Sequence, residues 1–256
     1  MISIDDFFST TEFDFWADKD GLIFPEKFLI EKYLDPQKTT LEAGTGGGRI
    51  LLAMQELGFQ ALSGFDYLSA FIDRAKQRDI SGNIDFSVQD AINLKYADRS
   101  FGQIIYLQQF ICFLEGQETV LKALQEASRV LQPGGKALFS VVSLDVRKRS
   151  WIHRLYISYI SILRKLRTSN RSIQYLPWLT IEGHKFNFNS LIDGGPQAYW
   201  FRISELAQML SSVNLQIIAI GSNYQINQGK MCSHLDELPK EPLKGILYVV
   251  CCKQNE

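Results

Sequence analysis

The chain has 256 residues, 46% of them hydrophobic, and a formal net charge of −1 at pH 7. A chain of this length and composition can bury a full core as one α/β domain. It has no basic and apolar leader and no uncharged apolar stretch of about eighteen residues, so we expect neither secretion nor a membrane span, and a cytoplasmic location.

The N-terminal segment is acidic and rich in aromatic side chains. Residues 1–35 contain nine acids against three lysines, and Trp16 belongs to their aromatic cluster. This pattern is compatible with an acidic amphipathic helix that packs on the core.

The stretch from Leu41 to Arg49 is a short β-like run, an acid, and a loop with glycine at alternate positions that opens an apolar helix. Glycine suits such a loop because the turn needs positive φ and because a Cβ would keep the backbone from a ligand that the free N–H groups face. Arg49 stands where a dinucleotide fingerprint requires glycine or alanine, and the Gly-Lys-Ser/Thr of a P-loop is absent. The loop therefore indicates a nucleotide-type cofactor of another class.

Two further β-type runs each end in an acid. The run 61–66 ends at Asp66, about twenty residues after the glycine loop, where a carboxylate can accept two hydrogen bonds from ribose hydroxyls. Capping of the next helix, predicted over 68–78, is the alternative for Asp66. The run 84–89 ends at Asp90, for which loop capping is the alternative.

Residues 101–109 read as a fourth strand and the loop after it. A helix end at 127–131 is followed by Pro133, Gly134 and Gly135. Because proline cannot continue a helix and glycine supplies a left-handed turn residue, we expect a sharp reversal into a fifth strand over 135–143.

Residues 145–200 interrupt this alternation. Residues 145–172 contain eight Arg and Lys and one acid. Apolar residues recur there at helical spacing and predict a helix with one apolar face for packing, composed of Trp151, Ile152, Leu155, Tyr156, Tyr159, Ile160, Leu163 and Leu166. Such a basic helix could attract an anionic substrate, a lipid surface or nucleic acid, but we favour a cap helix with a solvated basic face. Residues 181–189 alternate like a strand.

A helix over 204–212 and strands over 215–221 and 246–252 complete the pattern. With strands near 39–43, 61–66, 84–89 and 102–108, the alternation of strand and helix is typical of right-handed βαβ crossovers and a parallel sheet. A ligand is then expected at the carboxyl ends of the strands, beside the first strand.

Together, the glycine loop, the acids Asp66 and Asp90, and the Leu-x-Pro-Gly-Gly break resemble the motifs of the class I S-adenosylmethionine (SAM) dependent methyltransferases, of the methyltransferase type 11 or 25 sort. The resemblance covers roughly residues 39–143 and 200 to the end, although Gly102 stands where many relatives have an acid. It implies a Rossmann-like α/β fold with a seven-stranded, mostly parallel sheet in the order 3-2-1-4-5-7-6, the last strand antiparallel, helices on both faces and a helical and β cap insert. It also implies one domain over 1–256, with an N-terminal helical lid over 1–38 and a cap or substrate insert over 145–200.

The resemblance implies SAM as the cofactor and S-adenosylhomocysteine (SAH) as its product. It places Asp66 at the ribose, Asp90 at the adenine amino group and Tyr67 against the adenine face. The full set of cofactor residues that it implies is Glu42, Ala43, Gly44, Thr45, Gly46, Arg49, Asp66, Tyr67, Asp90, Ala91, Leu107 and Gln108. The candidate substrate residues are Trp16, Tyr156, His184 and Tyr199, and His184 is also the candidate general base.

The chemistry follows from the cofactor, because the sulfonium already makes the methyl group electrophilic and the protein has mainly to hold a nucleophile in line and exclude water. Signatures of nucleic-acid, protein-arginine and metal-dependent catechol-type enzymes are absent from the sequence. We therefore expect in-line transfer to an O, N or C nucleophile of a small metabolite, with no metal and no nucleic acid partner. The alternatives are a lipid, quinone or macromolecular acceptor reached through the basic cap, with peripheral membrane contact, and a non-catalytic SAM- or SAH-binding module. No pattern indicates an oligomeric state.

Overall fold

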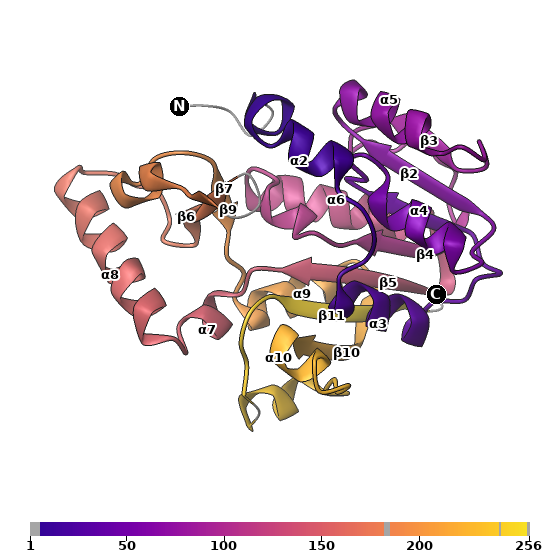
Figure 1. Ribbon diagram of the computed structural model, residues 1–256. Helices are drawn as coiled ribbons and strands as arrows, with labels where there is room; N and C mark the ends of the chain where they lie inside the picture. Colours follow the sequence, from indigo (N-terminus) through magenta and orange to yellow (C-terminus); the bar gives the residue numbers. More distant parts are fainter. Residues whose placement is uncertain (1–5, 182–184, 241, 255–256) are drawn as a thin grey trace.

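A seven-stranded sheet forms the centre of the computed structural model, which describes residues 6–181, 185–240 and 242–254 (Figure 1). Its order is β10-β11-β5-β4-β1-β2-β3, and all neighbours are parallel except that β11 runs antiparallel to β5 and β10. The strands are β1 (Thr40–Ala43), β2 (Leu62–Asp66), β3 (Asp85–Val88), β4 (Phe101–Tyr106), β5 (Leu131–Val141), β10 (Leu215–Ser222) and β11 (Leu247–Lys253). The predicted order 3-2-1-4-5-7-6 is confirmed, with β10 and β11 as the sixth and seventh strands.

Both faces of the sheet are covered by helices, which is why the central strands β1 and β4 are buried at every position without alternation. The helices of the two layers are α3 (Phe24–Tyr33), α4 (Arg49–Glu56), α5 (Ser69–Arg78), α6 (Gln117–Val130), α9 (Ile203–Ser212) and α10 (Asn223–Ile226). Consecutive residues of β4 point to opposite cores: Ile104 packs into the cluster with α6 and α9, and Ile105 into the cluster with α3, α4, α5 and α10. The crossovers β1-α4-β2 and β2-α5-β3 bring the carboxyl ends of three strands to one edge.

The Pro-Gly-Gly segment is confirmed in part, since α6 ends before Pro133 and the fifth strand follows. The segment lies inside β5 rather than before it, because Leu131 already pairs with Phe101 and Lys136 pairs with Gln103. Four residues of β5 therefore stand opposite Gly102 alone. Gly134 takes a φ of 72°, and a Cβ on Gly135 would lie 2.9 Å from the carbonyl oxygen of Gly102. The glycines thus permit a bulge and a close strand approach.

The insert between β5 and α9 forms a layer of its own beside the sheet. Its elements are α7 (Leu144–Arg147), α8 (Trp151–Leu166), β6 (Tyr175–Pro177), β7 (Thr180–Ile181), β8 (Lys185–Phe186), the 3₁₀ helix η3 (Phe188–Ile192) and β9 (Gln197–Tyr199). The continuous strand predicted over 181–189 is wrong, since two short strands are followed by η3, whose N-cap Asn187 accepts a hydrogen bond from the N–H of Asn189. Figure 1 shows α8 on the outside of the molecule, beyond β6 and β9.

The packing predicted for α8 is also wrong in part. Of the eight apolar residues expected to pack, Ile160 is buried and Tyr156 and Leu163 are partly buried. The other five are exposed to solvent: Trp151, Ile152, Leu155, Tyr159 and Leu166. The helix is apolar on two faces, so helical spacing alone did not identify the packed one.

The N-terminal segment divides into two parts. The π-helix η1 (Phe7–Thr11) and α2 (Phe13–Asp18) lie above the glycine loop and α5 (Figure 1). By contrast, α3 buries Leu29 and Ile30 completely in the core with α4. Within the described part of the predicted lid, residues 6–18 therefore lie over the loop, and α3 belongs to the core.

Candidate active site

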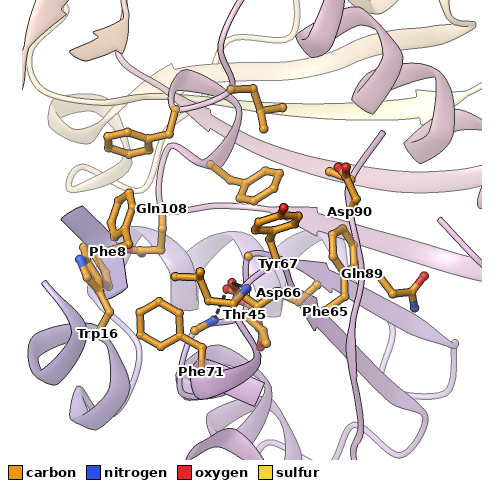
Figure 2. Close-up of a pocket in the computed structure, with 18 of the residues that line it drawn as sticks. Phe8, Trp16, Thr45, Phe65, Asp66, Tyr67, Phe71, Gln89, Asp90 and Gln108 are labelled. Atoms are coloured by element: carbon orange, nitrogen blue, oxygen red, sulfur yellow. Dashed lines mark hydrogen bonds between the residues drawn. The ribbon is translucent and has the colours of Figure 1, made fainter. Parts of the chain in front are cut away.

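A cavity of about 450 Å³ opens where β1, β2 and β3 end. Its floor is the glycine loop between β1 and α4, and its walls come from the N-terminal segment, α5 and the segment after β4. Figure 2 shows Trp16 and Phe8 on one side, Asp90 and Gln89 on the other, and Thr45 and Asp66 between them. Residues that the sequence placed at the ends of separate strands thus meet in one cavity.

The glycine loop touches protein as well as the cavity. A Cβ on Gly47 would lie 2.0 Å from the carbonyl oxygen of Ala17, so α2 can rest on the loop only because residue 47 is glycine. Gly46 lines the cavity with a φ of 53°, and its N–H donates a hydrogen bond to Oδ2 of Asp66 at 3.0 Å. The loop is therefore tied to the end of β2.

Asp66 uses both carboxylate oxygens in this arrangement, since Oδ1 accepts from the N–H of Leu68 at 3.0 Å. Burial raises the pKa of Asp66 above its usual value, although the backbone N–H groups act against this. The contact with Leu68 is the local one that helix capping anticipates, but the N-cap of α5 is Leu68 itself. A carboxylate has about four acceptor positions, so both oxygens retain capacity for hydroxyl donors from a ligand.

Glu42 lies at the end of β1 beneath the loop. Its side chain is buried, and Oε2 accepts a hydrogen bond from the hydroxyl of Thr45 at 2.7 Å. Burial raises the pKa of Glu42 from 4.5 to about 8. The cavity therefore contains a carboxyl group that stays largely protonated at neutral pH. A bound cation nearby would lower its pKa and stabilise its ionised form.

Arg49 is held by a residue that the sequence did not single out. Its guanidinium donates to both carboxylate oxygens of Glu26, at 2.7 and 2.8 Å, in a pair whose side chains are 5% and 1% exposed. Gln108 also donates to Glu26. Glu26 thus links the helix start of α3 to two residues that line the cavity.

The N-terminal segment is fastened by Arg78 of α5. Its guanidinium donates to the carbonyl oxygens of Ala17 at 2.7 Å, Gly47 at 2.8 Å and Lys19 at 3.0 Å. The ring of Phe13 stacks on Phe71 at 5.0 Å. These contacts hold Trp16 and Phe8 at the cavity wall.

At the other side of the cavity, Tyr67, Asp90 and Ala91 all contribute to the lining. The ring of Tyr67 is 61% exposed, and Figure 2 shows it over the cavity. Asp90 accepts a hydrogen bond from the N–H of Ile92 at 3.1 Å, which is the loop-capping contact considered as its alternative role. Its exposed carboxylate still faces the cavity.

Several predicted site residues are not part of this cavity. Ala43 and Leu107 are buried in the strand core and do not line it. Tyr156 donates to the carbonyl oxygen of Ser190, and Tyr199, 3% exposed, donates to Glu205, so both hydroxyls serve the insert and its junction with α9. His184 lies outside the described residues.

The cavity also contains residues that the sequence did not reveal as site residues. They are chiefly aromatic and flank the predicted motifs: Phe8, Phe65, Phe71, Gln89, Phe110, Phe113, Leu114 and Glu115. Phe65 and Gln89 immediately precede the predicted acids Asp66 and Asp90, so their proximity was a usable signal. Phe110 packs against Gly44, where a Cβ would lie 2.3 Å from its ring, and no local pattern announces that contact.

Comparison with known proteins agrees with this architecture. Residues 41–139 match the family of methyltransferase domains. A curated relative, the ubiquinone/menaquinone biosynthesis C-methyltransferase UbiE of Desulfotalea psychrophila, is 31% identical over 114 residues, which are 44% of this chain and 45% of that protein. The match therefore spans less than half of either protein.

Solved structures resemble the chain over nearly its whole length. A SAM-dependent methyltransferase from Methanosarcina mazei is 18% identical, with a TM-score of 0.64 over 93% of this chain and 100% of that one. The CcbJ methyltransferase of Streptomyces caelestis is 12% identical, with a TM-score of 0.65 over 96% and 97%. The 1,6-didemethyltoxoflavin-N1-methyltransferase of Burkholderia thailandensis, solved with its substrate and SAH, is 15% identical, with a TM-score of 0.58 over 98% and 87%.

Sheet order, cavity position and structural neighbours define a protein of the Rossmann-like methyltransferase fold. The domain match over 41–139 includes the glycine loop and the carboxyl ends of β1, β2 and β3, where the cavity lies.

Proposed function

We propose that this protein binds SAM in the cavity at the ends of β1, β2 and β3 and transfers its methyl group to a nucleophile of a small molecule by in-line displacement. The observation that carries the proposal is the position of Asp66, a half-buried carboxylate that faces both the cavity and the backbone of the glycine loop. The volume of about 450 Å³ and the aromatic walls support it, because small-molecule sites are mostly apolar hollows of roughly 300–1,000 Å³.

The polar groups suggest how SAM lies. We assign the ribose hydroxyls to Asp66, the adenine amino group to Asp90 and the adenine face to Tyr67. The methionine part then crosses Gly44, Thr45 and Gly46 toward Glu42. The ammonium group of SAM is the cation that would favour the ionised form of Glu42.

The acceptor is assigned to the side of the cavity made by the segment after β4. Phe110, Phe113 and Leu114 give it an apolar wall, and Glu115 supplies a carboxylate that could accept a proton from a hydroxyl or amine. Phe8 and Trp16 close the same side as a lid and would exclude water during transfer. The insert over 145–200 acts as a cap beyond this wall.

The proposal is tested by calorimetric titration of SAH into the wild-type protein and into Asp66→Asn. We expect the substitution to weaken SAH binding by about 1.5–3 kcal/mol, roughly 10-fold to 100-fold, because it removes the charge from hydrogen bonds to the ribose. The control is Asp85→Asn, an exposed aspartate at the opposite end of the neighbouring strand β3, which should bind SAH as the wild type does.

A folded wild-type protein that shows no heat with SAH would contradict the cofactor site. Equal affinities for wild type and Asp66→Asn would contradict only the ribose assignment. Methyl transfer itself is measured with radiolabelled SAM and pooled small-molecule acceptors, and cofactor binding with no transfer to any acceptor would favour a non-catalytic binding module.

A lipid quinone is the second candidate acceptor. It is supported by the named activity of the UbiE relative, which matches this chain over 114 residues. Partitioning the labelled product between water and an organic phase distinguishes it, since a methylated quinone would be extracted and a polar metabolite would not.

A further inference from the structure

The outward side of α8 is an apolar surface that no described part of the chain covers. Its residues recur at helical spacing within an arc of roughly 100°. The most exposed are Trp151 at 63%, Leu155 at 61%, Ile162 at 60% and Leu166 at 77%. The outer α8 face is defined as these four residues together with Ile152 and Tyr159.

The fold does not depend on this face, because the inward side of α8 anchors the helix. Ile157 and Ile160 pack into the core. Arg164, 4% exposed, donates to Asp193 at 2.5 and 2.7 Å and to the carbonyl oxygens of Ser172 and Tyr175. These contacts fix the orientation of α8, so the outer α8 face is exposed in a defined direction.

The apolar surface continues onto η3. The hydroxyl of Tyr159 donates to the carbonyl oxygen of Leu191 at 2.6 Å, which places η3 beside the outer α8 face. Phe188 is 75% exposed and Ile192 is 56% exposed. Exposed apolar patches of this continuity on a protein surface usually mark an interaction site.

The surroundings of the face are cationic. Lys148, Arg154 and Lys165 are exposed along α8 and just before it. The two acids in the described part of residues 144–200 are engaged elsewhere: Asp193 pairs with Arg164, and Asp145 accepts from the N–H of Ile203. No carboxylate within that part of the insert therefore offsets these cations.

We propose that the outer α8 face docks on the surface of an anionic lipid bilayer, with α8 lying in the plane of the headgroups. An interfacial helix buries its apolar side at the acyl boundary and keeps its cations at anionic headgroups, and tryptophan and tyrosine favour that depth. Among the described residues, no helix is long and apolar enough to cross a membrane. The 16-residue helix α8 therefore lies on the membrane surface in this proposal. Contact with the bilayer is peripheral.

The charge pattern favours a membrane over the other occupants. A second copy of the same face would bring two sets of cations together around the buried apolar area, which opposes pairing. Nucleic acid would satisfy the cations but would leave aliphatic residues such as Leu155, Ile162 and Leu166 without an apolar partner. Anionic lipid complements both properties at once.

The test is flotation of the full chain with vesicles of phosphatidylcholine alone and of phosphatidylcholine with one quarter phosphatidylglycerol. We expect binding to the anionic vesicles that weakens with added salt. Leu155→Ser with Ile162→Ser should lower the partition coefficient roughly tenfold or more, since two apolar side chains no longer enter the lipid. The matched control is Ile80→Ser, at a side chain that is 99% exposed in the turn after α5.

The charge contribution is tested separately with Arg154→Glu and Lys165→Glu together, against Lys95→Glu and Lys230→Glu as a double control of equal charge change. We expect the first pair to lose most of its preference for anionic vesicles and the second pair to lose far less. Circular dichroism and SAH titration on each variant verify that fold and cofactor site are intact, so that vesicle binding and the proposed catalytic function are judged independently.

Three outcomes overturn the proposal. In the first, wild-type protein stays in the aqueous fraction with anionic vesicles. In the second, the serine variants float as well as the wild type. In the third, the wild type sediments as a dimer that Leu155→Ser with Ile162→Ser converts to a monomer, which assigns the face to self-association.

Discussion

At the residue scale, Glu42 and Glu26 show how burial changes what a carboxyl group does. Glu42 is buried and accepts a hydrogen bond from the hydroxyl of Thr45, and its pKa rises to about 8 because burial disfavours the charge. Glu26 is equally buried but faces the guanidinium of Arg49. Glu42 is therefore a neutral carboxylic acid, and Glu26 is a carboxylate in an ion pair.

Stability should therefore depend on pH through Glu42. Between pH 4.5, its ordinary pKa, and about pH 8, the folded protein holds a proton that the unfolded chain releases, so the free energy of unfolding falls as pH rises across this window. Glu42→Gln removes this titration. We therefore expect the free energy of unfolding of the variant to exceed that of the wild type by a few kcal/mol at pH 8.5 and to match it closely near pH 5.

Urea unfolding at the two pH values measures this difference. Glu56→Gln, at an exposed position on α4, is the control. Its free energy of unfolding should differ from that of the wild type by the same small amount at both pH values. A gap between Glu42→Gln and wild type that does not grow with pH would contradict the neutral state of Glu42.

The ion pair predicts a different effect. Glu26→Gln leaves the buried guanidinium of Arg49 without its carboxylate, which should cost roughly 3 kcal/mol of unfolding free energy. Lys27→Ala, on the same helix, breaks only the exposed 3.8 Å pair with Glu31 and should cost less than about 1 kcal/mol. Urea unfolding compares them, and similar costs for the two variants would contradict a structural role for the buried pair.

At the element scale, Arg78 of α5 connects α2 to the glycine loop. Arg78, 13% exposed, donates to the carbonyl oxygens of Ala17 and Gly47. Arg74 on the same helix reaches α2 through the exposed Asp18 and also donates to Gln77 of α5. We expect Arg78→Ala to release η1 and α2, to speed amide hydrogen exchange over residues 7–18, and to weaken SAH binding roughly tenfold by opening the cavity wall. Arg74→Ala should change neither by much.

Hydrogen-exchange mass spectrometry of the peptides from this segment measures the release. Unchanged exchange in Arg78→Ala would show that the aromatic contacts of Phe13 and the packing on Gly47 hold the lid without it.

The main strands and crossover helices could be predicted from the sequence because local pattern determines them. Runs such as Leu62–Asp66 and Phe101–Tyr106 are mostly apolar with little alternation, as is typical of strands covered on both faces. The bulge at Pro133–Gly135 could not, because the same residues suit a turn, and only pairing of β5 with β4 distinguishes the two. The exposure of the outer α8 face could not be predicted for a similar reason. Helical spacing shows that a helix has apolar faces but not which of them packs against the rest of the protein.

At the scale of the whole molecule, topology explains which part of the site was predictable. Glu42, Asp66 and Asp90 end three parallel strands, and the carboxyl ends of neighbouring parallel strands meet at one edge. Their convergence on one cavity follows from the strand order alone. The sequence therefore predicted which of these residues gather at one edge of the sheet.

The remaining site residues depend on tertiary packing that no motif encodes. Tyr156 and Tyr199 belong to an insert that packs through its own buried residues, such as Leu176 and Ala198, and that packing keeps them from the cavity. Phe8 reaches the site through its ring contact with Phe113, and Glu26 through its ion pair with Arg49 of α4. Both contacts join residues more than twenty positions apart in the sequence.

The measurement that tests the central claim most directly is a crystal structure of the protein with SAH. We expect the nucleoside at the end of β2, with its ribose hydroxyls within hydrogen-bond distance of Asp66, and the homocysteine part over Gly44 and Gly46 with its sulfur toward Phe110 and Phe113. Electron density for SAH at another place, or side chains filling this cavity in a protein that binds SAH in solution, would contradict the account.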